Sequence, residues 1–349
     1  MKTLLKIVLF SGVIFASIGG FLYWEFFYKG LDDSRSSVLI EVRPGQTLHQ
    51  VVNELKAKDI SIPQLQYKVW ARLTEAHKKL HVGEFELSPH GKSPAQVLTE
   101  ILEADSKGYK ITIVEGLNLW EIEKIFAAPP LNVPPETYQK WIRDPARLDR
   151  MKIPVPSKEG VARTLEGYLY PETYMHYKYS SPEDIIDQML TLFEENMGPL
   201  LDQHDWGNTA QGRHDLITLA SIVEKESQVL DEQPTIASVY WNRIEKGMRL
   251  QADPTTIYGL MPGFNGNITR KNLREKNAYN TYMMKGLPAG PIANPGKHTL
   301  AATVDPATTE YFFFVSKNDG SHIFSKDYAT HNKWVDEYQR KRRKRTKQK

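Results

Sequence analysis

The most apolar part of the chain is its N-terminal end. Residues 7–24 read IVLFSGVIFASIGGFLYW and contain no charged side chain. An α-helix of this length spans about 27 Å, which matches one bilayer core. Lys2 and Lys6 precede the stretch, and acidic residues dominate the segment that follows it. The pattern therefore predicts a single-pass anchor with a cytoplasmic N-terminus and the rest of the chain outside.

The residues at the end of this stretch bear on whether it is cleaved. A signal peptide ends in small residues and a polar region. Here the end is aromatic: Phe21, Tyr23, Trp24, Phe26, Phe27 and Tyr28. Such side chains gather at membrane–water interfaces. We therefore expect an uncleaved anchor over residues 1–28, with cleavage as the alternative, and a polar linker over 29–37.

Residues 38–108 show the pattern of a small α/β subdomain. The predicted strands are 38–42 (VLIEV) and 83–87 (GEFEL). Thr47 and Ser93 each precede apolar residues at helical spacing and are predicted to cap helices. The order strand, glycine turn, helix is repeated over residues 111–126 (ITIVEGLNLWEIEKIF).

The remainder, residues 109–338, has the pattern of a larger mixed α+β domain. Amphipathic helices are predicted over 182–200, 214–228 and 233–246, and a last helix from about Ala329. The intervening segments predict a loop over 165–174 and a hairpin around Asn318-Asp319-Gly320. Residues 250–297 are rich in Pro, Gly and Asn, and are too long for an idle loop, so we expect them to shape a site.

The amino-acid composition indicates the class of protein and excludes several kinds of site. The 349 residues amount to about two domains, and the 40% hydrophobic content is typical of globular proteins. The absence of cysteine excludes disulfides, thiolate metal sites and cysteine nucleophiles. The net charge of +3 depends on a basic tail over 339–349, and the tail from Arg340 on contains eight cations and no acid. The rest of the chain is thus mildly acidic, which does not favour binding to nucleic acid.

Common catalytic motifs are missing from the sequence. No complete phosphate-binding loop and no G-x-S-x-G motif occur. His77 and His81 have zinc-ligand spacing, but Lys78 and Lys79 lie between them, so we interpret them as surface histidines. Neither a metal nor a cofactor is expected. The remaining acids, amides and tyrosines suit sugar chemistry, for which one or two carboxyl groups suffice.

Two glutamates end the apolar helix predicted over 214–228. Glu224 and Glu226 both flank its apolar stripe, and periodicity barely separates them. Glu226 has the more apolar neighbours one turn back, which slightly favours it. A carboxyl group held against aliphatic side chains stays protonated to higher pH, as a general acid requires. The alternative is that both are solvated acids that pair with Lys225 or with another helix.

Several motifs follow one another along the chain. They are 42–48 (VRPGQTL), 166–174 (EGYLYPETY), 220–227 (ASIVEKES), 241–259 (WNRIEKGMRLQADPTTIYG) and 278–296 (AYNTYMMKGLPAGPIANPG). Together with the anchor, they resemble the YceG-like family of endolytic murein lytic transglycosylases over essentially all of the chain except the basic tail. The resemblance implies a LysM-like subdomain over 38–108. It also implies a catalytic domain over 109–338 on the outer (periplasmic) face of the cytoplasmic membrane.

The resemblance further implies a function. Glu226 would be the catalytic residue that cleaves the bond between N-acetylmuramic acid and N-acetylglucosamine in nascent glycan strands. The products would carry 1,6-anhydro ends, and glycan elongation would stop. The implied partners are peptidoglycan, the membrane and penicillin-binding synthases. A true muramidase and a cell-wall-binding scaffold are the alternatives.

Other candidate substrate-binding residues lie in the same motifs. They are Glu166, Tyr170, Gln251, Asp253, Thr255, Asn280 and Tyr282. Such side chains can hydrogen-bond to acetamido groups or stack on sugar rings. Turn formation, helix capping by Asp253 and core packing are the alternatives. Asn294 is interpreted as a turn residue rather than a ligand. The basic tail is either a solvated extension or a contact with anionic lipids or envelope polymers.

Overall fold

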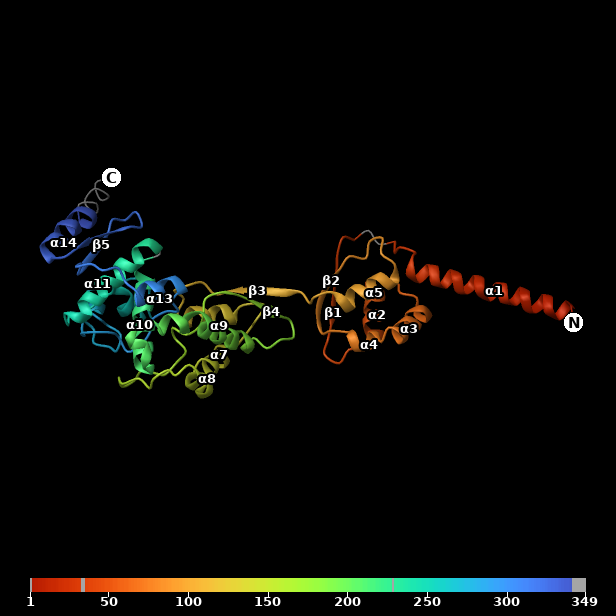
Figure 1. Cartoon of the computed structure of the whole chain (residues 1–349), viewed down its shortest axis with the longest axis horizontal. Helices are drawn as coiled ribbons and strands as arrows, with labels where there is room; N and C mark the ends of the chain where they lie inside the picture. Colours follow the sequence, from red (N-terminus) through yellow and green to blue (C-terminus); the bar gives the residue numbers. More distant parts are fainter. Residues whose placement is uncertain (1, 33–34, 228, 341–349) are drawn as a thin grey trace. The chain divides into compact units, whose positions relative to one another are not determined.

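The computed structural model of the chain describes residues 2–32, 35–227 and 229–340 (Figure 1). These residues form two compact units. Unit 1 comprises the chain up to Tyr109 together with Met175–Ser181, and unit 2 comprises Lys110–Tyr174 and the chain from Pro182 onward. Within the described residues the strands pair into three two-stranded sheets, and helices make up most of the rest. The chain is therefore a mixed α+β protein, as the sequence predicts.

The N-terminal helix α1 (Lys2–Phe27) contains the apolar stretch. Its segment Leu4–Phe27 has a mean hydropathy of 2.0 and is long and apolar enough to cross a membrane. This is compatible with a single-pass membrane anchor. The last turn behaves differently, because Phe26 is only 1% exposed and packs in the core of unit 1, with its ring 6.2 Å from that of Trp70. The prediction that Phe26 belongs to an interfacial belt is therefore wrong.

The segment after α1, which the sequence predicts to be a linker, makes close contacts with unit 1. The Leu31 N–H donates to the Lys92 carbonyl over 2.8 Å. A Cβ atom added to Gly30 would come within 2.8 Å of the Gly91 carbonyl oxygen. The described part of the predicted linker thus lies against a loop of unit 1.

Unit 1 is built on an antiparallel pair of strands. β1 (Val38–Val42) pairs with β2 (Gly83–Leu87) from Val38 opposite Leu87 to Val42 opposite Gly83. Its other helices are α2 (Leu48–Ala57), α3 (Gln64–Leu73), α4 (Ala76–Lys79) and α5 (Pro94–Glu103). Figure 1 shows them gathered around the strands. Both strands and both capped helices agree with the sequence-based predictions.

The predicted caps explain why α2 and α5 begin where they do. Thr47 and Ser93 each accept a hydrogen bond from the backbone N–H three residues on. The glutamine at that position, Gln50 or Gln96, bonds back to the cap residue. These reciprocal bonds satisfy N–H groups that the first turn of a helix cannot satisfy by itself.

The histidines with zinc spacing do not form a site. α4 ends at Lys79, so His77 and His81 do not share a helix face, and both are exposed. Among the described residues no group of three or more His, Cys, Asp or Glu side chains is placed to hold a metal.

A ribbon of two strands, β3 (Gly108–Thr112) and β4 (Thr173–Tyr177), is shared by the two units. The residues after β4 are held in unit 1 by Lys178, whose Nζ lies 2.6 Å from Glu84 and 3.3 Å from Glu41. β4 begins inside the region predicted as a loop, so that loop is shorter than predicted.

The first half of unit 2 is helical. It contains α6 (Leu119–Ala127), α7 (Pro135–Trp141), α8 (Pro145–Arg150), α9 (Glu183–Leu201) and the short η1 (Asp205–Asn208). α6 and α9 agree with the predicted helices. Sequence reasoning missed α7 and α8, which each start on a proline. A proline is tolerated at the first helical position because its missing N–H has no helical partner there.

The second half of unit 2 surrounds α10 (Ala210–Glu226), whose apolar residues from Leu216 to Val223 are fully buried. The other helices are η2 (Leu230–Glu232), α11 (Gln233–Glu245), α12 (Asp253–Tyr258), η3 (Asn272–Arg274) and α13 (Lys297–Val304). Figure 1 shows α10, α11 and α13 side by side, and they also contact one another.

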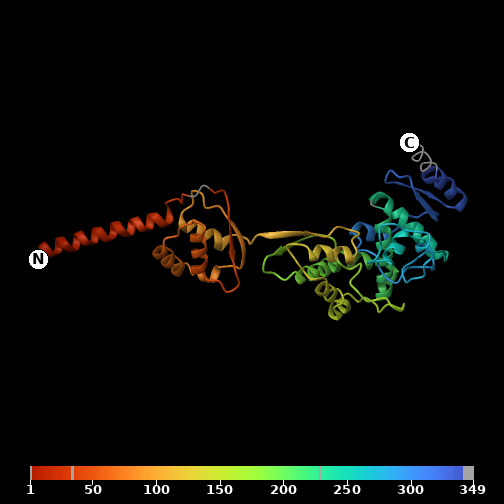
Figure 2. The same ribbon diagram turned by 180° about the vertical axis from the view of Figure 1, so that it is seen from behind.

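The C-terminal part of unit 2 is the predicted hairpin and helix. β5 (Phe313–Ser316) pairs with β6 (His322–Ser325), and α14 (Tyr328–Val335) packs on both strands. A final turn, η4 (Asp336–Arg340), follows. These elements are drawn in dark blue in Figure 2. Apart from Arg340, the basic cluster lies outside the described residues.

Candidate active site

The two acids at the end of α10 have different surroundings. The Glu224 carboxylate accepts hydrogen bonds from the Gly296 N–H over 2.9 Å and the Thr299 hydroxyl over 2.6 Å. The Glu224 carboxylate therefore accepts from an N–H group at the beginning of α13 that the helix itself cannot satisfy. Glu226, the last residue of α10, accepts a hydrogen bond from the Tyr240 hydroxyl over 2.9 Å. Tertiary packing thus separates the two acids that helical periodicity barely distinguishes.

Glu226 lies on a groove of about 540 Å³ within unit 2. α10 and α11 contribute Glu226, Tyr240 and Arg243, and the residues after them contribute Leu250, Gln251, Asp253 and Tyr282. The C-terminal part contributes Phe313, Phe314, Val315, Ser316, His322, Tyr328, His331, Val335 and Gln339. A carboxyl group, several aromatic rings and hydrogen-bonding side chains therefore line one cavity.

The environment of Glu226 favours its protonated form. Burial raises the pKa of Glu226 to about 7; the Asp253 charge acts in the same direction, while the Tyr240 hydrogen bond and Arg243 oppose it. A carboxyl group with this pKa is protonated in about half of the molecules at neutral pH. It can both donate and accept a proton there, as general acid–base catalysis requires.

Three of the predicted substrate-binding residues line the groove. The Tyr282 hydroxyl donates to Asp253 Oδ1 over 2.7 Å. Asp253 is the first residue of α12 and makes no side-chain cap to it, so the capping alternative is not realised. Gln251 is exposed and has a left-handed backbone with a φ of 52°. The stretch 250–297 therefore contributes to the site, as its length and composition suggested.

Thr255 and Asn280, in contrast, are fully buried and do not line the groove. The Thr255 hydroxyl donates to the Ala252 carbonyl over 2.7 Å. The Asn280 side chain accepts from the Thr256 hydroxyl and donates to three backbone carbonyls, the shortest bond being 2.7 Å to Glu275. Both residues hold the wall of the groove in place. Their polar atoms are used inside the protein, which does not favour their predicted role as direct substrate ligands.

Glu166 is also an interior residue. Its carboxyl group is 3% exposed and accepts hydrogen bonds from the Leu119 N–H over 3.1 Å and the Tyr258 hydroxyl over 2.8 Å. Burial raises the pKa of Glu166 to about 8. It is not among the residues that line the groove, and its buried, hydrogen-bonded carboxyl group does not favour the predicted contact with substrate.

Two other residues of the sequence-based analysis have packing roles. Tyr170 is partly buried against the core of unit 2 and does not line the groove. Its stacking on substrate therefore stays a prediction. Asn294 is fully buried, donates to the Leu117 carbonyl over 2.8 Å and accepts from the Leu169 N–H over 2.9 Å. It joins separate segments of unit 2 and is not a groove residue.

Sequence reasoning missed the part of the groove formed by the C-terminal elements and α11. Tyr240 and Arg243 lie on α11, and Phe313 and His331 lie on β5 and α14. One feature of the sequence could have predicted this part of the groove. Residues 311–315 read YFFFV, which is apolar on both faces of a strand. A strand of this kind in a two-stranded hairpin has to pack against other residues on both of its faces.

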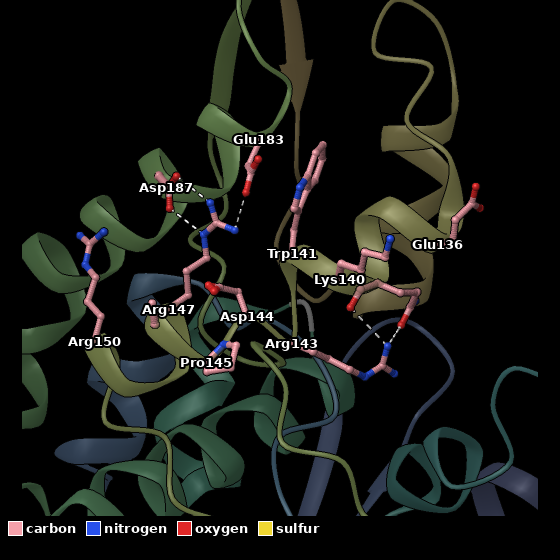
Figure 3. Close-up of a pocket in the computed structure, with 12 residues that line it drawn as sticks. Glu136, Lys140, Trp141, Arg143, Asp144, Pro145, Arg147, Arg150, Glu183 and Asp187 are labelled. Carbon is pink, nitrogen blue, oxygen red and sulfur yellow. Dashed lines mark hydrogen bonds and ion pairs between the residues drawn. The ribbon is translucent and has the colours of Figure 1, made fainter.

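A second, larger hollow of about 1180 Å³ lies among α7, α8 and α9 (Figure 3). Its central cation, Arg147, lies 2.8 Å from both Asp187 and Glu183. The ion pair with Arg147 lowers the pKa of Asp187. The central charges of this hollow are thus paired with one another.

Comparison with known proteins decides which family this geometry belongs to. The sequence profile of the YceG-like family matches residues 40–337. The chain belongs to the YceG-like family. The matched range contains every residue that lines the groove except Gln339. The groove, including its C-terminal wall, is therefore part of the YceG-like region.

The chain is similar to curated members and to a solved structure. It is 28% identical over 329 residues to a protein of Bacillus subtilis named endolytic murein transglycosylase, which covers 92% of this chain and 90% of that protein. A Streptococcus pneumoniae serotype 2 protein of the same name is 28% identical over 190 residues, covering 53% of this chain and 34% of that protein. The match thus spans about a third of the streptococcal relative. A crystal structure of a YceG-like protein from Listeria monocytogenes has a TM-score of 0.58 and 29% identity, covering 86% of this chain and 100% of that one.

Proposed function

We propose that this YceG-like protein is an endolytic peptidoglycan lytic transglycosylase with Glu226 as its catalytic residue. The observation that carries the proposal is the state of Glu226, a groove carboxyl group with a pKa of about 7. The name of the Bacillus subtilis relative and its match over most of both chains support the reaction type.

The first step requires an acid. Protonated Glu226 donates its proton to the glycosidic oxygen between N-acetylmuramic acid and N-acetylglucosamine. The bond from that oxygen to C1 of the muramic sugar breaks, and an oxocarbenium-like centre forms at C1. The Tyr240 hydroxyl and the nearby Arg243 favour the carboxylate that remains, since both lower the pKa of Glu226.

The second step requires a base. The ionised Glu226 takes the proton from the C6 hydroxyl of the same muramic sugar, and the hydroxyl oxygen closes onto C1 to give a 1,6-anhydro end. No water is consumed, so a second carboxylate to activate water is unnecessary. Confinement of the sugar in the groove makes this internal attack effectively unimolecular.

The groove side chains suit a glycan. Gln251, Asp253 and Tyr282 offer hydrogen-bonding groups beside Glu226, and Phe313 and Tyr328 offer aromatic surfaces for sugar rings. Thr255 and Asn280 act indirectly, by holding the segments that carry these residues. Glu166, Tyr170 and Asn294 support the core on which the groove is built.

The cellular setting follows from α1 and unit 1. The apolar helix supports a single-pass anchor in the cytoplasmic membrane, with the catalytic part outside, where the glycan lies. Residues 38–108 would be a LysM-like subdomain; the antiparallel β1–β2 pair with helices between its strands supports this. Penicillin-binding synthases would be partners at the growing strand, and the basic tail would contact anionic lipids or envelope polymers.

The experiment compares Glu226→Gln with Glu224→Gln in the full-length protein. The substrate is purified glycan strands, and mass spectrometry identifies the products. Glu226→Gln should lower the rate by about a hundredfold or more, because the proton donor is lost. Glu224→Gln should retain most of the activity, since an amide oxygen can still accept from Gly296 and Thr299.

Each other outcome has a clear meaning. Release of anhydro ends at the wild-type rate by Glu226→Gln would refute the catalytic assignment. Products one water heavier would identify a hydrolase instead. A whole-cell phenotype that survives Glu226→Gln would favour the scaffold function.

A further inference from the structure

The groove contains a buried cation without an anionic partner. Arg243 is 8% exposed, and its guanidinium donates to the Phe312 carbonyl over 2.7 Å and the Leu250 carbonyl over 2.5 Å. Among the described residues no carboxylate forms an ion pair with it. A buried charge is costly unless it is paired, so this groove wall is suited to an anionic group.

A second hydrogen-bonding side chain, His331, contacts the same aromatic ring as this cation. Phe313 connects the two, because the Arg243 guanidinium carbon lies 5.3 Å from the Phe313 ring centre and the His331 ring stacks on the same ring at 5.2 Å. Arg243, Phe313 and His331 all line the groove that contains Glu226.

The protonation of the His331 ring follows from the surroundings of its two nitrogens. Nδ1 is buried without a hydrogen-bond partner, whereas Nε2 is neither buried nor hydrogen-bonded among the described residues. Burial and the charge of Arg243 both lower the pKa of His331, so the ring is neutral near pH 7. A buried, unpaired N–H is rarer than an unpaired acceptor, which places the single proton on Nε2. His331 therefore offers a neutral N–H donor on the groove that Arg243 also lines.

We propose that Arg243 and His331 form a subsite for a carboxylate of the substrate. The inference rests on the proposed function and deepens it. In peptidoglycan a carboxyl group is carried by the lactyl ether of muramic acid, or by the stem peptide linked to it, whereas N-acetylglucosamine carries none. A carboxylate subsite thus distinguishes the two alternating sugars.

This discrimination sets the register of the glycan. Glu226 and Asp253 lie on the same groove and disfavour a carboxylate beside them. The carboxylate at Arg243 and His331 then determines which glycosidic bond meets Glu226. A strand shifted by one sugar would leave Arg243 unpaired and present the wrong bond.

The test measures binding in a full-length Glu226→Gln background, in which cleavage is removed. The probes are a tetrasaccharide of alternating N-acetylglucosamine and N-acetylmuramic acid with free lactyl carboxylates, its lactyl methylamide, its stem-peptide form and chitotetraose. The carboxylate-bearing probes should bind about tenfold more tightly than the methylamide and chitotetraose, the scale of one charge-assisted hydrogen bond.

Two further changes locate the subsite. His331→Phe keeps the stacked ring and removes the N–H donor, and Arg243→Lys keeps the charge and removes the planar fork. Either should reduce the preference for carboxylate probes. His77→Phe makes the same chemical change on the surface of unit 1 and should leave the preference intact. Arg243 also supports the backbone, so His331→Phe, with its unfolding midpoint checked, decides the test if Arg243→Lys fails to fold.

The outcomes separate the two proposals. Equal binding of all probes by the parent protein, or an unchanged preference in a folded His331→Phe variant, overturns the subsite. Tight binding of the stem-peptide probe alone supports a subsite that reads the peptide carboxylate, and tight binding of the free lactyl form supports the sugar carboxylate. If the wild-type protein releases no anhydro ends, the proposed function fails even where the binding preference holds.

Discussion

The hydrogen bond between Tyr240 and Glu226 allows a quantitative prediction about pH dependence. The Tyr240 hydroxyl donates to Glu226 Oε1 over 2.9 Å and stabilises the carboxylate form. Tyr240→Phe removes this bond and keeps the ring. The protonated form of Glu226 then becomes relatively more stable, so its pKa rises.

The magnitude follows from the energy of one hydrogen bond. Such a bond contributes about 1 kcal/mol net, and one pKa unit corresponds to about 1.4 kcal/mol. The pKa of Glu226, about 7 in the native protein, should therefore rise by about 0.7 units. Activity that requires protonated Glu226 falls as the pH passes its pKa, so the alkaline limb should move to higher pH by the same amount.

The assay is the pH profile of kcat/KM for release of anhydro ends, from about pH 5 to about pH 9 at constant ionic strength, because this quantity reports the free enzyme. Tyr258→Phe is the matched control. It removes the same hydroxyl from the hydrogen bond to Glu166, so it should lower the unfolding midpoint and leave the limb in place. An alkaline limb of Tyr240→Phe that stays at the wild-type pH, or moves down, would refute the assignment of Glu226 as the acid.

Three other substitutions test the site and its support. Asp253→Asn removes a charge that raises the pKa of Glu226, so the alkaline limb should fall by about half a pH unit; an upward shift would contradict this. Asn294→Ala leaves the buried Leu169 N–H unpaired and removes the amide donor to the Leu117 carbonyl and to Glu166, and it should lower the free energy of unfolding by about 2–4 kcal/mol in urea titrations; a loss under about 0.5 kcal/mol would show that Asn294 is not a core cross-link. Phe26→Ala removes a ring from the core of unit 1 and should destabilise that unit by about 3 kcal/mol. Hydrogen exchange in α3 and α5 of the detergent-solubilised protein would measure this, and unchanged exchange would mean that the end of α1 does not stabilise unit 1.

Local features of this protein could be predicted from the sequence because their causes are local. Thr47 and Ser93 bond to residues only three positions away, so the starts of α2 and α5 are readable from a short window. β1 and β2 follow from alternating side chains between turns. The proline-started helices α7 and α8 were missed because proline more often signals a connection than a helix start.

The assignment of side chains to the groove or to the interior depended on residues far apart in the chain. Glu224 and Glu226 both flank the apolar stripe of α10, so helical periodicity barely separates them. What separates them is their hydrogen bonding. The beginning of α13, more than seventy residues further along the chain, donates hydrogen bonds to Glu224, whereas Glu226 accepts from the Tyr240 hydroxyl of α11. Asn280 and Tyr282 likewise lie only two positions apart in the sequence, yet only Tyr282 of the two lies on the groove.

The sequence by itself thus determined the apolar N-terminal helix, the main secondary-structure elements, the resemblance to the YceG-like family and a short run that contains the proposed catalytic acid. The tertiary structure alone decided which acid is held in a groove, which polar residues are used inside the protein, and that β5 and α14 complete the site. The physical reason is the distance along the chain over which each interaction acts. Caps and periodicities act over one or two helical turns, whereas burial and hydrogen bonding at Glu226 arise from elements that meet only in the folded chain.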